Sequence, residues 1–179
     1  MRKARANPLI IALFLVAALV LGGCVSPKEQ GQTGNAYRVT DMLGRQVDLK
    51  KPVERVVAIG PGALRLYCYI NGIEKVVGVE QLEKNSPTGR PYFLAYPSLA
   101  GLPVIGPGGP NNAPDPEKIL AVKPDVIFTT YNTDKAAADA LQGKTGIPVV
   151  ALSYGKVSLF DPAVYSSLKL IGEIMNQEK

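Results

Sequence analysis

Four loop segments of this 179-residue chain carry side chains suited to holding a small polar molecule: 60–65, 80–92, 106–112 and 129–132. Arginine presents a planar fork of donors for carboxylates and other oxyanions, and tyrosine presents a flat apolar face with a polar tip. The segments contain no nucleophile paired with a base, so they predict binding of a bulky, polar, anionic molecule rather than catalysis. The candidate ligand-binding residues are Pro61, Gly62, Arg65, Arg90, Tyr92, Gly108, Asn111, Tyr131 and Asn132.

The turn Gly60-Pro61-Gly62 follows an apolar run and opens a helix, as phosphate-binding loops do. A dinucleotide fingerprint needs a third glycine where Arg65 stands, and Pro61 removes an N–H that would face a pyrophosphate. A P-loop would need Gly-Lys-Ser/Thr. The turn therefore favours a ligand other than a nucleotide. A nucleotide- or cofactor-binding α/β enzyme domain, and a tight turn with no ligand, stay open as alternatives.

Composition narrows the possible chemistry. The chain has no histidine, which removes imidazole-based catalysis, imidazole zinc sites and histidine ligation of haem; we predict no metal site, no cofactor and no enzyme activity. Three of the 20 basic residues and none of the 15 acidic residues lie in the first 23 positions, leaving 17 basic against 15 acidic. A nucleic-acid partner needs a basic cluster, and none is present. Cys68 lies in an apolar segment and is expected to be buried.

The N-terminal residues predict export and membrane anchoring. A basic start at 2–5 precedes the apolar run 8–21, as in secretory signals, and this run is shorter than the about 20 residues of a spanning helix. We predict a signal peptide over 1–23. The sequence "LGGC" resembles a bacterial lipobox, which implies cleavage before Cys24 and lipid on that residue. Residues 24–36 are predicted to form a flexible tether, so the expected location is extracytoplasmic, lipid-anchored to a bacterial or archaeal membrane.

The elements that position the loops follow from the hydrophobic pattern. Alternation over 37–49 around a turn at 42–44 predicts a hairpin. Near-continuous apolar strands separated by helices then predict an α/β fold, with a parallel sheet flanked by helices. In such a sheet, loops that follow the strands meet at the carboxyl edge, where ligands bind. The predicted strands are 56–59, 76–79, 102–106, 125–130 and 146–152, and the predicted intervening helices are 63–71, 117–122 and 133–142.

The last predicted helix opens at Asp161-Pro162 and carries an apolar stripe from Val164 to Met175. No glycine follows the stripe. We therefore expect 161–179 to be the start of a longer helix, and 37–160 to be one α/β ligand-binding lobe.

Seven stretches together resemble a known family: "VTDMLGRQVDL", "PVERVVAIGPG", "INGIEKVVGV", "PVIGPGG", "DPEKILAVKPDVIFTT", "TGIPVVAL" and "SLKLIGEI". From Tyr37 to the end, the chain is similar to the N-terminal lobe of the substrate-binding lipoproteins of ABC importers for iron-siderophore, haem and cobalamin. The resemblance implies two α/β lobes joined by one rigid helix, with a metal complex held in the cleft and passed to an ABC permease. It also implies that Glu117 docks to the permease; as a carboxylate at a helix N-terminus it would in any case be favourable there.

The second lobe of that family is expected after the last helix, so the resemblance implies a truncated form with the N-lobe only. Half a cleft predicts weak or absent ligand binding by the chain alone, and a stripe from Val164 to Met175 left partly bare. Arg65 and Arg90 favour a ferric-siderophore-type chelate. The lack of histidine counts against zinc and manganese, whereas tyrosine ligation of haem stays possible. A lipid-anchored interaction domain without a small-molecule ligand is a further alternative.

Overall fold

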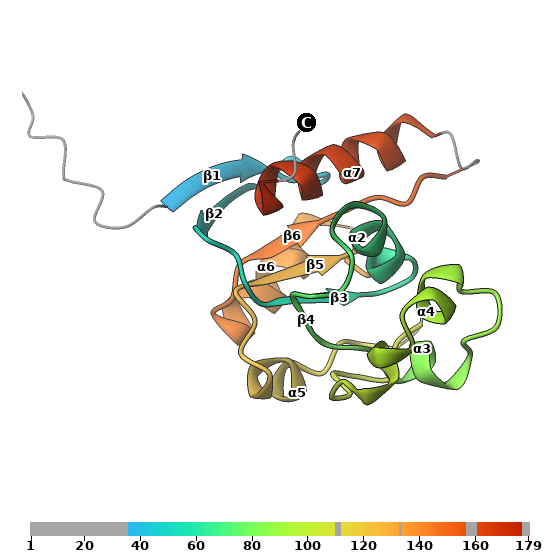
Figure 1. The fold of residues 1–179 in the computed structure, drawn as a ribbon. Coiled ribbons are helices and arrows are strands. Elements are labelled where there is room, and N and C mark those ends of the chain that lie inside the picture. The colour runs from blue at the N-terminus through green and yellow to red at the C-terminus, as the bar shows by residue number, and fades with distance from the viewer. Residues whose placement is uncertain (1–35, 110–111, 133, 157–160, 177–179) are drawn as a thin grey trace, which may run out of the picture. The chain divides into compact units, whose positions relative to one another are not determined.

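The computed structural model describes residues 36–109, 112–132, 134–156 and 161–176 (Figure 1). Within these ranges, four parallel strands form one sheet in the order β4-β3-β5-β6. β3 (Val56–Ile59), β5 (Val126–Thr129) and β6 (Val149–Ala151) are buried throughout, because helices cover both faces, and β4 (Val76–Gly78) lies at an edge. The predicted α/β fold with a parallel sheet flanked by helices is confirmed.

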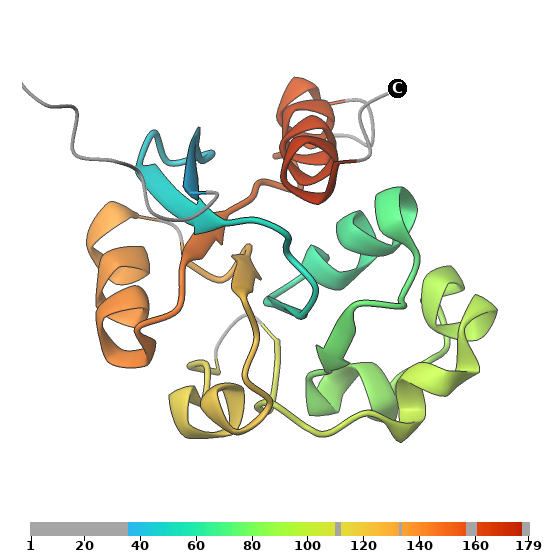
Figure 2. The same ribbon diagram turned by 60° about the vertical axis from the view of Figure 1, so that its left-hand side comes forward.

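The helices divide between the two faces of the sheet (Figure 2). α2 (Ala63–Asn71) and α7 (Pro162–Met175) contribute to one hydrophobic cluster, and α5 (Pro116–Ala121) and α6 (Lys135–Thr145) contribute to the other. Successive strand residues alternate between the clusters, as side chains in a strand must. Ala58 and Phe128 belong to the first cluster and Ile59 and Ile127 to the second.

The predicted hairpin is present as β1 (Ala36–Thr40) and β2 (Gln46–Lys50), which pair antiparallel from Ala36 opposite Lys50 to Thr40 opposite Gln46. Its turn reaches the outer edge of β6, where the Met42 N–H donates to the Ala151 carbonyl at 3.0 Å. The hairpin therefore extends the molecule beyond the edge of the parallel sheet without adding a strand to it.

The apolar stripe of α7 is covered along part of its length. Ile171 and Met175 are buried because α7 packs on α2, whereas Val164 and Leu168 are only partly buried against the same cluster, so that end of the stripe is partly bare, as expected. Within the described residues the helix ends at Met175, where Asn176 adopts a left-handed conformation (φ 57°) and its N–H bonds back to carbonyls of the last turn. Asparagine can take this cap position in place of glycine, and the prediction that 161–179 begins a longer helix stays a prediction.

The segment between β4 and α5 also differs from expectation. The predicted strand at 102–106 is reduced to a single parallel bridge between Val79 and Val104. The polar stretch before it folds into α3 (Gln81–Asn85), α4 (Pro91–Ala95) and a 3₁₀ turn (Pro97–Gly101). Elements of five residues are too short to show a helical period in sequence, which is why they were missed.

The predicted signal peptide, the lipidation site Cys24, the tether up to residue 35 and the ligand-binding candidate Asn111 lie outside the described residues. In the part of the chain that the structure describes, no helix has both the length and the hydropathy to cross a bilayer.

Candidate functional site

The loops that follow β3, β4 and β5 touch one another at the carboxyl edge of the sheet. Both carboxylate oxygens of Glu80 accept a hydrogen bond from the Gly60 N–H, each at 3.1 Å. A Cβ on Gly60 would lie 2.5 Å from the Tyr131 backbone nitrogen, so only glycine permits this approach. Thr130 Oγ1 donates to the Pro61 carbonyl at 2.7 Å. The structure thus places the predicted residues Pro61 and Tyr131 on neighbouring loops that hold each other in place.

The loop after the Val79–Val104 bridge lies beside these three loops. We call the four loops together the rim of the sheet. The Gly106 carbonyl accepts the Gln81 N–H at 2.8 Å, and a Cβ on Gly108 would lie 2.8 Å from the Glu80 Cβ. Asn112 Nδ2 donates to the Gly108 carbonyl at 2.7 Å, which closes the loop on itself. The predicted residue Gly108 is therefore part of the rim because its lack of a side chain lets this loop pack on Glu80.

Glu80 gives the glycine turn an electrostatic character that does not suit phosphate. Burial raises the pKa of Glu80 to about 7, against the opposing effect of the Gly60 N–H, and nearby Glu83 adds to the rise. A phosphate loop presents its backbone N–H groups to the ligand, whereas the Gly60 N–H is already taken by this carboxylate. The observed geometry therefore counts against the nucleotide alternative.

A cavity of about 420 Å³ opens between the loops after β5 and β6 and the turn of the hairpin. Met42, Leu43 and Leu152 form its apolar lining, and its polar lining comprises Thr130, Asn132, Ser153, Tyr154, Gly155 and Lys156. Its volume lies in the range of about 300–1,000 Å³ that is typical of sites for drug-sized ligands. Asn132 belongs to one of the loops predicted from the sequence, whereas the loop after β6 was not among them. That loop follows a strand of the same sheet, and this position alone could have identified it.

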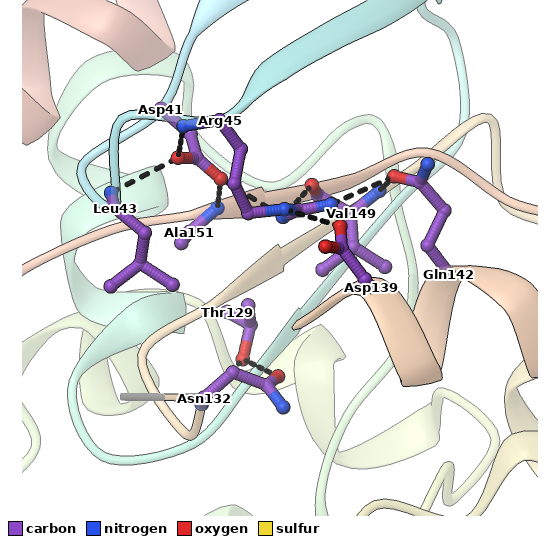
Figure 3. Close-up of polar contacts among 9 residues, drawn as sticks. All are labelled: Asp41, Leu43, Arg45, Thr129, Asn132, Asp139, Gln142, Val149 and Ala151. Carbon is purple, nitrogen blue, oxygen red and sulfur yellow. Dashed lines mark hydrogen bonds and ion pairs between the residues drawn. The ribbon is translucent and has the colours of Figure 1, made fainter. Parts of the chain in front are cut away.

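Two donors without partners among the described residues lie in this region, one on the cavity lining and one beside the glycine turn. Asn132 Oδ1 accepts from Thr129 Oγ1 at 3.0 Å, which leaves its Nδ2 group with no partner among the described residues (Figure 3). The Arg65 Nε is buried and likewise has no partner in the described part of the chain. A Cβ on Gly62 would lie 3.5 Å from Arg65 Nη2 and 3.7 Å from the Tyr154 Cβ, so the guanidinium and this tyrosine flank the glycine turn.

Arg90 and Tyr92, by contrast, are occupied within the protein. The Tyr92 hydroxyl donates to Glu83 Oε2 at 2.7 Å, and its ring is part of the hydrophobic core. Burial, followed by this hydrogen bond to a carboxylate, raises the Tyr92 pKa. Arg90 Nε lies 3.0 Å from the same carboxylate oxygen of Glu83. These two residues therefore stabilise the α3–α4 segment through Glu83, and contact of either residue with a ligand stays a prediction.

A buried ion pair fixes the hairpin turn beside the cavity (Figure 3). Asp41 Oδ1 accepts the backbone N–H groups of Leu43 and Arg45 at 3.0 and 2.9 Å. Asp41 Oδ2 accepts from Arg45 Nη1 at 2.9 Å and from the Ala151 N–H at 3.2 Å. The rest of the Arg45 guanidinium reaches β6 and α6, bonding the Val149 carbonyl, Asp139 Oδ1 and Gln142 Oε1.

Glu117 is exposed in the first turn of α5, close to the same rim. Asp115 caps this helix by accepting the Lys118 N–H at 3.1 Å, which lowers the Asp115 pKa. A Cβ on Gly106 would lie 3.5 Å from the Asp115 backbone nitrogen. The start of α5, which carries Glu117, therefore packs against the loop that borders Glu80.

A second hollow, of about 380 Å³, lies at the opposite edge of the sheet, between the end of β2 and the loops that precede β5 and β6. Asp48, Lys50, Asp125 and Pro148 are among its lining residues. None of the predicted site residues borders it. Among the described residues, no group of three or more histidine, cysteine, aspartate or glutamate side chains is arranged to hold a metal ion.

Comparison with known proteins gives two relatives by sequence, and no family model matches the chain. An uncharacterized ABC transporter substrate-binding lipoprotein, YvrC of Bacillus subtilis, is 26% identical over 178 residues, covering 95% of this chain and 52% of the relative. The molybdate-binding protein MolA of Haemophilus influenzae is 30% identical over 115 residues, covering 64% of this chain and 31% of that protein. The chain thus spans about half or less of the length of the curated relatives it matches.

Solved structures share the fold. A periplasmic solute-binding protein from Veillonella parvula superposes with a TM-score of 0.66 at 23% identity, covering 80% of this chain and 42% of that one. MolA with bound molybdate gives 0.64 at 23% identity, covering 79% and 47%. Homologues and structural neighbours of the chain are thus substrate-binding proteins of ABC transporters, which are not enzymes.

Proposed function

We propose that the chain is a substrate-binding component of an ABC importer and that it holds its ligand in the cavity at the carboxyl edge of the sheet. The observation that carries this proposal is the rim itself. Four loops from different parts of the chain meet there through Glu80, Gly60 and Tyr131, and an open cavity of ligand size borders them. The relatives named as substrate-binding and molybdate-binding proteins support the same assignment.

The proposed ligand is a ferric-siderophore-type chelate. The unpartnered Asn132 amide, the exposed Lys156 ammonium group and the Arg65 guanidinium are all hydrogen-bond donors, which suits the anionic oxygens that surround iron in such complexes. A bare oxyanion is the second candidate, because the same donors suit molybdate and one relative is named for binding it.

An NMR titration of the purified chain tests the site. Gallium(III) complexes replace the iron ones because gallium is diamagnetic, gallium(III) protoporphyrin replaces haemin for the same reason, and sodium molybdate completes the set of probes. Amide shifts confined to Gly62, Tyr131, Asn132 and Ser153 would support the proposal. No shift with any probe up to millimolar concentration, or shifts at the opposite hollow around Asp125, would contradict it.

Docking to a permease is proposed for the face that carries Glu117. The side chain is exposed and lies near the cavity rim, so a permease arginine could reach it while the ligand is released. Glu117→Arg should abolish co-purification with the cognate permease in detergent while leaving ligand shifts unchanged. Lys118→Ala, one residue along the same helix, is the control and should co-purify normally.

Lipid anchoring at Cys24 is proposed from the "LGGC" sequence alone. Cys24→Ser should move the protein from the membrane fraction to the soluble extracytoplasmic fraction and remove the acyl mass from the processed N-terminus. A Cys68→Ser control should stay in the membrane fraction, since Cys68 is buried. Membrane retention of the Cys24 variant would contradict the proposal.

A further inference from the structure

The cavity has two chemically different sides. Thr130, Asn132 and Ser153 come from the loops after β5 and β6 and offer hydroxyl and amide groups. Met42 and Leu43 come from the hairpin turn and offer only hydrocarbon and a thioether. In Figure 3 the Leu43 side chain points away from Arg45, toward the side on which Asn132 lies. A ligand that fills the cavity therefore meets donors on one side and an apolar wall on the other.

The apolar wall, formed by Met42 and Leu43, is attached to β6 by hydrogen bonds and an ion pair. The Asp41 carboxylate accepts two backbone N–H groups of the turn, those of Leu43 and Arg45, and also the Ala151 N–H of β6. Arg45, whose side chain is 6% exposed, completes the connection by pairing with Asp41 and by donating to the Val149 carbonyl. Hydrogen bonds to charged partners in a buried setting are among the stronger ones in proteins. These bonds attach the turn that carries Met42 and Leu43 to β6.

Charge around the cavity is sparse. Lys156 is the only ionisable cation that lines it among the described residues, and no acidic side chain lines it. A small, doubly charged oxyanion would leave the apolar wall facing water and would fill little of the about 420 Å³. An anionic complex with aromatic or aliphatic edges would cover Met42 and Leu43 while its oxygens meet the donors.

We propose that the hairpin turn is the specificity wall of the ligand site, with Arg45 and Asp41 as positioning residues, and that it selects an amphiphilic chelate with apolar edges over a bare oxyanion. This inference rests on the proposed function, because it assumes that the cavity is the ligand site. It assigns a role in recognition to a segment far from the loops predicted in sequence.

The test compares three anionic probes on the full chain: the gallium(III) complex of 2,3-dihydroxybenzoate, which has aromatic edges, gallium(III) citrate, which has none, and sodium molybdate. We expect the wild-type chain to bind the aromatic complex most tightly. Met42→Ser combined with Leu43→Ser should lower that affinity about tenfold, as expected for loss of two apolar contacts, and should leave citrate and molybdate affinities within twofold. Arg45→Lys should lower the aromatic-to-citrate affinity ratio in the same direction, since lysine cannot reproduce the guanidinium fork.

Asp48→Asn is the matched control, because Asp48 forms an exposed ion pair with Arg38 on the same hairpin and is remote from the turn. It should leave the affinity ratio unchanged. A simple loss of stability would lower all three affinities together and cannot move the ratio. A wild-type preference for molybdate or citrate, or an unchanged ratio in the Met42/Leu43 variant, would overturn the inference alone. Failure of every probe to bind the wild-type chain would overturn the proposed function itself.

Discussion

Glu80 and Gly60 form a hydrogen bond in which one backbone N–H is shared by both oxygens of a buried carboxylate, with 3.1 Å to each. Among the described residues no lysine or arginine pairs with Glu80, so a single neutral donor offsets its charge. The pair joins the ends of β3 and β4 at the rim of the cavity. Its protonation state should therefore affect both the stability and the rigidity of the rim.

The stability of the protein is predicted to fall as pH rises from about 5 to about 7. The Glu80 pKa is about 7 in the folded protein against 4.5 for a free glutamate. Across that window the folded state keeps a proton that the unfolded chain has lost, and a state that binds more protons is favoured by lower pH. The contribution of Glu80 is a loss of about 1–3 kcal/mol by pH 8. Urea unfolding followed by tyrosine fluorescence from pH 4.5 to pH 8 measures it.

Glu80→Gln should remove this dependence, because an amide has the same shape and no charge. The exposed Glu117→Gln variant is the control and should unfold with the wild-type pH dependence. A Glu80→Gln curve that still follows the wild type across the window would show that other groups carry the effect.

Gly60→Ala is predicted to destabilise the protein by about 3 kcal/mol or more, because a Cβ would clash with the Tyr131 backbone in addition to the strain of a positive φ. Gly89→Ala separates the two effects. Gly89 has a similar φ of +82° with no atom within 4 Å of the added carbon, so it should lose only about 1–2 kcal/mol. Equal losses of unfolding free energy for the two variants, measured by chemical denaturation, would mean that the Tyr131 backbone moves to accommodate the added carbon.

Arg45→Ala is predicted to lose about 3–5 kcal/mol of unfolding free energy, because it leaves the Asp41 carboxylate buried without its cation. The Arg45→Ala/Asp41→Ala double variant should lose less than the sum of the single variants. Arg38→Ala removes an ion pair whose side chains are more than 60% exposed, and it should change the unfolding free energy far less than Arg45→Ala does. Additive losses in the double-mutant cycle would contradict a coupled pair.

Tyr92 and Tyr154 are predicted to behave in opposite ways. Tyr92→Phe removes the donor to Glu83 and should lose about 1–3 kcal/mol of stability without changing the affinity for a gallium chelate. Tyr154 is 45% exposed beside the cavity, so Tyr154→Ala should weaken binding and change stability by less than about 0.5 kcal/mol. Thermal unfolding and NMR titration of both variants distinguish the roles. Weaker binding by the Tyr92 variant would show that Tyr92 belongs to the ligand-binding site.

The alternation of apolar strands with helices was enough to predict the parallel sheet and the edge at which the loops meet, since both follow from hydrophobic periodicity and chain direction. Pro61, Gly62, Gly108, Tyr131 and Asn132 could be placed near this edge because they directly follow strands or lie in a glycine-rich loop; their contact with a ligand stays a prediction. The packing of their loops depends on Glu80, and no local sequence pattern predicts that Glu80 is buried.

Arg90 and Tyr92 show the limit of reasoning from residue type. Both suit a polar ligand, and in the structure both pair with Glu83, a residue of the same segment. The choice between an internal partner and a ligand is made by tertiary contacts between α3 and α4. The contribution of Met42 and Leu43 was hidden for a similar reason, because it needs the hairpin turn to reach β6, about 110 residues away in sequence.

The contact between Asp41 and Ala151 has a consequence for solubility. β6 is an outer strand of the sheet, and outer strands with free N–H and C=O groups invite pairing with other chains. The Asp41 carboxylate and the Met42 N–H occupy the Ala151 donor and acceptor, and at the opposite border the 103–105 segment bonds to Val79. At Ala151 and at Val79, therefore, the backbone groups at the borders of the sheet are not free to pair with an added strand. The turn beside the cavity thus also disfavours edge-to-edge aggregation.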